Sequence, residues 1–231
     1  MAVQDEIANR PVRIWGTEAR AFSLTEVIAD GVVHGIGIAI SLVLGSVLLA
    51  FAALETAPSE VPALAVYVGS LLVALSVSLA FNLSPISRAK QILARLDQAA
   101  IFLFIAGTYT PFLAVIGGTP AGNIMMAVVW GASLVGIALK LIIPERFGRM
   151  AIVLYLGIGW SGVLVFQALA ATLPLTTLWL LVAGGITYSL GIVFHLWQRL
   201  KFHNVLWHVF VVLGATLHLL AIFDCMVLSR L

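Results

Sequence analysis

Charged residues and cysteines are both scarce in this chain. Asp, Glu, Lys and Arg make up 10% of the 231 residues, whereas 62% of the residues are hydrophobic. A soluble domain of this length could not keep so much apolar surface away from water, so the composition indicates a protein embedded in a membrane. With a single cysteine, Cys225, the sequence allows neither an intrachain disulfide nor a cysteine-based metal cluster.

The hydrophobic residues are gathered in seven long segments. Each is long enough to cross a bilayer core of about 30 Å at about 1.5 Å per helical residue. The segments are Val32–Leu54, Val61–Leu83, Ala99–Ile116, Ile124–Ile143, Met150–Ala171, Leu175–Trp197 and Val205–Leu228. The sequence therefore predicts an all-α integral membrane protein, a seven-transmembrane-helix bundle in which residues 24–231 form one membrane domain. Residues 1–23 lack the apolar core of a cleavable signal peptide and are expected to be a cytoplasmic segment.

Positive charges lie almost entirely on one side of these segments. Ten of the twelve Lys and Arg residues precede the first segment or fall in alternate gaps, Lys140 lies at the end of the fourth segment on the same side, and only Arg230 falls on the other side. Because cytoplasmic loops are enriched in Lys and Arg, the N-terminus is predicted to be cytoplasmic and the C-terminus external, in a multi-pass protein of the inner (plasma) membrane. The basic residues form no stripe interleaved with exposed aromatics, so membrane lipids and not nucleic acid are the expected partners. Self-association into a homo-oligomer is left open.

Polar residues of the apolar segments gather near their predicted cytoplasmic ends. Glu26, Asp30 and His34 are four residues apart and share one helical face. The second, third and seventh segments bring further polar residues to the same depth: Ser78, Asn82, Asp97, His203, Asn204 and His208. An unsatisfied polar group in hydrocarbon costs several kcal/mol, so this convergence favours a metal or proton-handling site.

Each of these residues also has a purely structural explanation. Asp97 could be a helix-opening charge favoured by the helix dipole, and Asn204 could be an N-cap. Glu26 and Asp30 could form a solvated first turn. At the external side the comparable residue is Asp224, for which a helix interface would suffice. Isolated caps would scatter over both sides of the membrane, whereas these residues share one side, which favours the site.

Three stretches of the sequence form recognisable motifs. They are Ala29-Asp-Gly-Val-Val-His34-Gly-Ile-Gly37, preceded by Ser23-Leu-Thr-Glu26; Arg95-Leu-Asp97 with Ala106-Gly-Thr-Tyr-Thr-Pro-Phe112; and His203-Asn-Val-Leu-Trp-His208. In this order they resemble the bacterial hemolysin III family. That family belongs with the progestin and adipoQ receptors, the adiponectin receptor-related superfamily. The resemblance implies a seven-helix bundle with a cytoplasmic N-terminus, in agreement with the charge distribution.

The resemblance also implies a zinc site. In those relatives the ion is held by a His at the end of the second helix and by two His four apart on the seventh, and an Asp of the third helix contacts it through water. Here His208 matches one ligand, Asp97 matches the carboxylate and Ser78 matches the serine of the second-helix motif. Asn82 and Asn204 stand at the other two ligand positions.

These two departures weaken the expected zinc site. Zinc prefers imidazole nitrogen or thiolate, and a neutral amide oxygen is a poorer ligand, so zinc is expected to be held weakly. His203, displaced by one residue from the ligand position, and His34 are reserve nitrogens. Asp30 stands where the family usually has Asn.

The residues and the resemblance together suggest two classes of function. In the first, the protein resembles zinc-dependent lipid amidases and acts in membrane lipid homeostasis: water held by Asp97 attacks an acyl linkage, with His208 as metal ligand and Ser78 preserved beside it. In the second, the protein is non-catalytic, with a degenerate metal site, or it is cytolytic or pore-forming, as the family name implies. A water-filled pore would need a continuous polar lining, which the middle and external halves of the segments scarcely supply.

Overall fold

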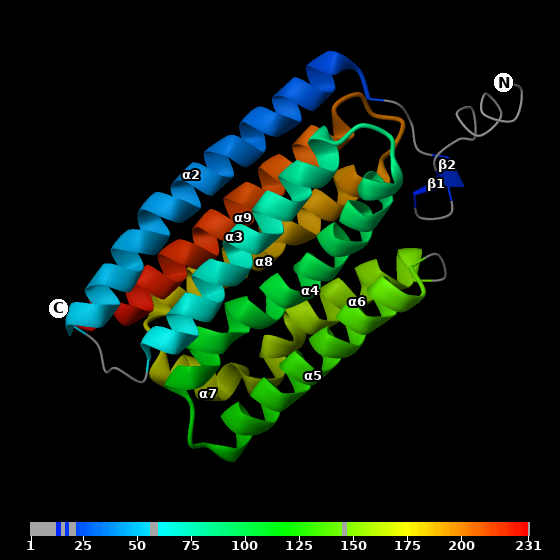
Figure 1. The fold of residues 1–231 in the computed structure, drawn as a ribbon. Coiled ribbons are helices and arrows are strands. Elements are labelled where there is room, and N and C mark those ends of the chain that lie inside the picture. Colours follow the sequence, from blue (N-terminus) through cyan, green and yellow to red (C-terminus); the bar gives the residue numbers. More distant parts are fainter. Residues whose placement is uncertain (1–12, 15–16, 19–21, 56–59, 145–146, 231) are drawn as a thin grey trace, which may run out of the picture.

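Seven membrane-length spans build the protein (Figure 1). The computed structural model describes residues 13–14, 17–18, 22–55, 60–144 and 147–230. Its elements are β1 (Arg13–Ile14), β2 (Thr17–Glu18), α2 (Leu24–Glu55), α3 (Val61–Leu83), α4 (Arg88–Val115), α5 (Pro120–Ile142), α6 (Gly148–Trp160), η1 (Ser161–Val165), α7 (Phe166–Thr172), α8 (Leu175–Leu196), α9 (His203–Met226) and η2 (Leu228–Arg230). The two short strands pair antiparallel, and α6, η1 and α7 together make the fifth span. The predicted seven-helix membrane architecture is confirmed.

Two helices begin well before the apolar segments that predicted them. α2 starts at Leu24 and α4 starts at Arg88, while the remaining boundaries agree to within about one turn. Polar first turns escape a hydropathy reading but still form helix when they are capped, as where the Ser87 hydroxyl accepts a hydrogen bond from the Lys90 amide at 3.2 Å. The prediction that Asp97 opens a helix is therefore wrong, because Asp97 lies about two and a half turns inside α4.

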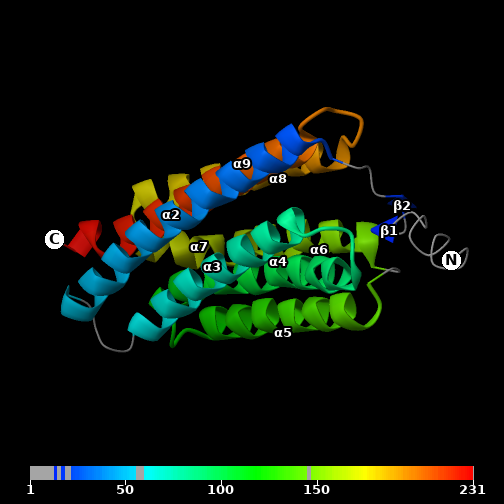
Figure 2. The same ribbon diagram turned by 45° about the horizontal axis from the view of Figure 1, so that its top comes forward.

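The spans form a ring that is folded into two layers (Figure 2). α2, α8 and α9 lie in one layer, and α3, α4, α5 and α6 lie in the other. α9 packs between α2 and α8, while α3 packs against α2 and α4. α4 is the most buried span: 61% of its most apolar stretch is buried, compared with 17% for α8. α2 and α9 run parallel, so the polar beginnings of the first and seventh spans meet at the same end of the bundle (Figure 1).

Glycines allow α8 and α9 to approach closely. The ring of His218 on α9 lies against Gly184 of α8, and the ring of Tyr188 on α8 lies against Gly214 of α9. A Cβ at Gly184 would come within 2.3 Å of His218 Cδ2, and one at Gly214 within 2.9 Å of Tyr188 Cζ. Close packing over small residues is a common way for membrane helices to associate, and here it also fixes the orientation of both rings.

The fifth span is broken in its middle, whereas the sequence predicted one continuous helix over Met150–Ala171. η1 interrupts it after α6. The Tyr109 hydroxyl of α4 donates a hydrogen bond to the Gly159 carbonyl and accepts one from the Gly162 amide, both at 2.7 Å. Because an apolar environment offers no water to the backbone groups that a break releases, this side chain takes the place of water.

Candidate functional site

A buried polar stripe runs along the beginning of α2. Glu26, Asp30 and His34 are separated by four residues, which places them one above another on the same helical face. Their exposed fractions are 2%, 3% and 1%. The alternative of a solvated first turn is therefore wrong: the stripe faces the interior of the bundle.

Glu26 joins the start of α2 to the loop before α9. Its carboxylate accepts hydrogen bonds from the amide and hydroxyl of Ser23, at 2.9 and 2.8 Å, in the manner of a capping box. Its second oxygen accepts a bond from the Phe202 amide at 2.9 Å. Phe202 has a left-handed backbone, with φ of 62°, directly before α9 begins. Glu26 thereby fixes the position of the first turn of α9 relative to α2.

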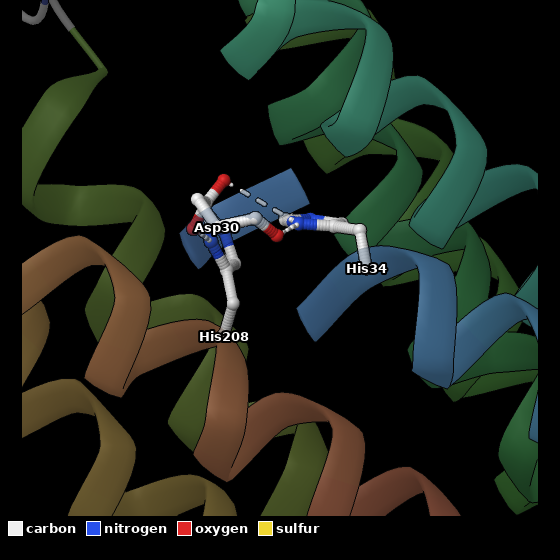
Figure 3. Close-up of side chains that lie close together, drawn as sticks. All are labelled: Asp30, His34 and His208. Atoms are coloured by element: carbon white, nitrogen blue, oxygen red, sulfur yellow. Dashed lines mark hydrogen bonds and ion pairs between the residues drawn. The ribbon is translucent and has the colours of Figure 1, made fainter. Parts of the chain in front are cut away.

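Asp30 lies between two histidines from different helices (Figure 3). Its Oδ1 is 2.5 Å from Nδ1 of His208 on α9, and its Oδ2 is 3.4 Å from Nδ1 of His34 on α2. The two imidazole rings lie edge to face, with centroids 4.3 Å apart. One possible ligand atom from each of the three side chains lies within 4.8 Å of the others, so Asp30, His34 and His208 form a group that could hold a metal ion. We call these three residues the metal-competent group.

The unpaired ligand atoms of Asp30 and His34 could bind a metal ion. His34 Nδ1 is 2.9 Å from the Asp30 carbonyl and must donate to it, so its Nε2 carries the lone pair. Among the described residues, neither His34 Nε2 nor Asp30 Oδ2 has a hydrogen-bond partner, although both are buried. Metal-bound histidines typically donate their other N–H to a carbonyl or carboxylate, which is how the Asp30 carbonyl holds His34. Two imidazoles and one carboxylate are a ligand set found in catalytic zinc sites.

The two asparagines that replace family histidines hydrogen-bond each other. Asn204 Nδ2 donates to Asn82 Oδ1 at 3.0 Å and lies 3.4 Å from Asp30 Oδ1. Asn82 Nδ2 in turn donates to the Ser78 carbonyl at 2.9 Å. α9 begins at His203, so Asn204 is inside the helix and the interpretation of it as an N-cap is wrong. The amides line the metal-competent group on one side and satisfy one another.

Ser78 and Asp97 lie on the opposite side of His208. Ser78 Oγ is 3.4 Å from His208 Nε2, and the Asp97 carboxyl interacts with the Ser78 side chain. His34, Ser78, Asp97 and His208 all line one cavity of about 170 Å³. His203, the remaining candidate ligand, packs its ring 5.7 Å from that of Phe22 and is not one of the three residues that group around Asp30.

Most of the remaining cavity wall is apolar. It extends from the polar group along α3, α4 and α9 to the space between α6 and α8, with walls that include Leu71, Phe104, Leu156, Trp160 and Ile192. Trp160 is 38% exposed on the outside of the bundle, so the cavity reaches residues at the membrane-facing surface. A polar group with metal-ligating atoms therefore stands at one end of an apolar chamber.

Known proteins resemble this chain along most of its length. A family model described as Haemolysin-III related matches residues 22–219. The Hemolysin-3 homolog of Bacillus subtilis is 35% identical over 88% of this chain and 94% of that protein. Hemolysin-3 of Bacillus cereus is 33% identical over 83% of this chain and 88% of that protein. The chain belongs to the haemolysin-III family.

The relationship extends to animals. The human Monocyte to macrophage differentiation factor is 30% identical over 54% of this haemolysin-III family protein and 52% of its own length. No solved structure matches the chain. Together with the seven apolar spans, the bacterial relatives identify a multi-pass protein of the cell membrane, as the sequence predicted.

Sequence reasoning placed Asp30 on the correct face but did not propose it as a ligand. The resemblance implied a signal: Asp30 stands where the resemblance leads one to expect Asn, and Asn82 and Asn204 stand where it leads one to expect ligand histidines. Reading these three departures together would have indicated a carboxylate ligand. The pairing of Asp30 with His208, which is 178 residues away, could come only from the packing of α2 against α9.

Proposed function

We propose that this protein is a metal-dependent hydrolase that cleaves an acyl linkage, most readily an amide, of a membrane lipid. The observation that carries the proposal is the position of His34 and His208, which group with Asp30, at the polar end of a largely apolar cavity that reaches the membrane-facing surface. The cavity matches the acyl chain of a lipid, and the polar end matches its headgroup linkage. A role in membrane lipid homeostasis would follow from such a substrate.

The proposed metal ligands are Asp30, His34 and His208, and zinc fits this donor set. A zinc ion held by these three residues would supply a Lewis acid that makes a nearby water more acidic. This ligand set differs from the one that the family resemblance implies, since the positions of Asn82 and Asn204 contribute amides that bond each other. The expectation of weak zinc binding, which rested on those amides, applies to the family's positions and not to Asp30.

Asp97 and Ser78 are the proposed catalytic residues. Asp97 is partly buried, lines the cavity and interacts with Ser78, so it can orient a water and accept its proton beside the linkage. Ser78, within 3.4 Å of His208 Nε2, can donate a hydrogen bond to the carbonyl oxygen as negative charge develops there. The apolar walls exclude bulk water from the chain, which strengthens these electrostatic interactions.

A measurement of metal content and fatty acid release tests the proposal. Protein purified in mild detergent, without added zinc, should contain metal and should release fatty acid from an amide-linked lipid such as a ceramide. Asp97→Asn should retain the metal and lose most of the release, whereas His208→Ala should lose both. Metal retention with no release from amide or ester lipids would refute the catalytic proposal.

A non-catalytic role is the second candidate, and two contacts favour it. The direct bond between Asp30 Oδ1 and His208 Nδ1, together with the pair formed by Asn82 and Asn204, satisfies much of the polar cluster without an added group. The names of the two Bacillus relatives refer to haemolysis. The apolar walls of the cavity do not favour a water-filled pore, so release of a dye from lipid vesicles should be no faster with the protein than without it.

A further inference from the structure

A second pair of polar side chains lines the same cavity far from the metal-competent group. Tyr188 of α8 and His218 of α9 both contribute to its wall. His218 lies ten residues after His208 on α9, which corresponds to about 15 Å along the helix axis. Tyr188 and His218 are therefore lining residues well away from the polar end formed by His34 and His208.

Both side chains present a buried polar atom that lacks a partner. Within the part of the chain that the structure describes, neither the Tyr188 hydroxyl nor His218 Nδ1 makes a hydrogen bond. His218 Nε2 lies 3.2 Å from the Leu181 carbonyl, which can only accept, so Nε2 carries the proton and Nδ1 is an acceptor. The pair thus offers one acceptor and one hydroxyl that can donate.

The two rings are held in place by the packing of α8 against α9. The Cδ2–Nε2 edge of His218 lies against Gly184, so its Nδ1 faces away from that contact. The Tyr188 ring lies against Gly214, and the centroids of the two rings are 5.4 Å apart. The close glycine contacts hold both rings on that side.

We propose that Tyr188 and His218 form a subsite for a hydroxyl group carried on the acyl chain of the lipid in this cavity. A hydroxyl donates to His218 Nδ1 and accepts from the Tyr188 hydroxyl, whereas a methylene does neither and leaves two buried polar atoms unsatisfied. A site built to hydrogen-bond a hydroxyl discriminates against the analogue that lacks it for this reason. The subsite rests on the proposed function only in placing an acyl chain in the cavity.

Competition binding with paired fatty acids tests the subsite. The probes are a saturated fatty acid and the same acid with a mid-chain hydroxyl, each displacing a fluorescent fatty acid from the detergent-purified protein. The wild type should prefer the hydroxylated acid by about tenfold, the range expected for satisfying one or two buried polar atoms. Tyr188→Phe and His218→Leu should each bring the two affinities close together.

Two controls separate this proposal from misfolding and from the proposed function. Tyr67→Phe removes a buried hydroxyl that donates to the Ala215 carbonyl at 3.3 Å and lies outside the cavity wall, so it should keep the preference. His208→Ala should lose metal and lipid hydrolysis but also keep the preference. Equal wild-type affinity for the two acids, as expected if a water occupies the subsite, would overturn the proposal. So would a preference that survives Tyr188→Phe.

Discussion

Asp224 and Asp30 lie at opposite ends of the bundle, and their surroundings differ. Asp224, near the end of α9, accepts a hydrogen bond from Thr177 of α8 at 2.5 Å. Asp30, near the beginning of α2, lies between His34 and His208, and its Oδ2 has no hydrogen-bond partner among the residues described. The first arrangement joins two neighbouring helices with a neutral hydroxyl. The second brings three ionisable side chains together and leaves lone pairs in the interior.

Asp224 has the surroundings of a structural carboxylate, whereas Asp30 has surroundings that could hold a ligand. An acidic group withdrawn from water must be stabilised by hydrogen bonds or charge, and the Thr177 hydroxyl contributes to that for the partly buried Asp224 without forming a metal-ligand set. Around Asp30, by contrast, two imidazoles and the carboxylate form a group that could hold a metal ion. A carboxylate inside the bundle is therefore not by itself a candidate site, whereas one that groups with further ligand atoms is.

The largest expected effect concerns the side of the membrane that each carboxylate faces. Positive charges in the alternate loops predict that the Asp30 end faces the cytoplasm and the Asp224 end faces outside. A topology reporter fused after Leu231 should be active only outside the cytoplasm, and one inserted near Gln91 only inside. The reverse pattern at both positions would place the Asp30 end outside and the Asp224 end in the cytoplasm.

Metal content should distinguish the two carboxylates next most strongly. Asp30→Asn should reduce bound metal from about one ion per chain to near zero, because it removes a charged ligand, while Asp224→Asn should leave it unchanged. Elemental analysis of the purified proteins measures both. The triple variant Asp30→Asn, Asn82→His and Asn204→His should recover metal through the positions that the family resemblance implies. Full metal retention by Asp30→Asn alone would show that the ion is held elsewhere.

At the Asp30 end, removal of the Glu26 side chain is expected to lower the stability of the bundle. Glu26→Ala removes the cap of α2 and a charged acceptor of the Phe202 amide, and should lower the free energy of unfolding by about 2 kcal/mol. Unfolding followed by circular dichroism in mixed detergent measures this change. Glu26→Gln, which keeps one acceptor, should lose less. A variant as stable as wild type would mean that the junction of α2 and α9 does not depend on Glu26.

The smallest effect is expected at the Asp224 end. Thr177→Val removes the hydroxyl donor while nearly preserving shape, and should destabilise the bundle by about 1 kcal/mol with no effect on metal content or lipid release. The same unfolding titration and metal assay apply. A loss of metal in this variant would show that the two ends are coupled, contrary to the structural role assigned to Asp224.

Periodicity and hydropathy predicted the spans well because each helix satisfies its own backbone and needs only length and apolarity to cross a bilayer. They did not predict the polar turns that are helical or the apolar span that is broken. The first turns of α2 and α4 are polar yet helical, and the break at η1 depends on Tyr109, a side chain of another helix. The face shared by Glu26, Asp30 and His34 was predictable from spacing, since helical periodicity is local.

The sequence by itself determined the membrane class, the seven spans, the family and the collection of polar residues near one end of the bundle. Only the tertiary structure decided which of these side chains meet: Asp30 with His208, Asn82 with Asn204, and the paired rings of Tyr188 and His218 over one cavity. The physical reason is that depth and helical face follow from position along a single helix. Contact between helices depends on their order around the ring and on close packing at glycines, which no single segment specifies.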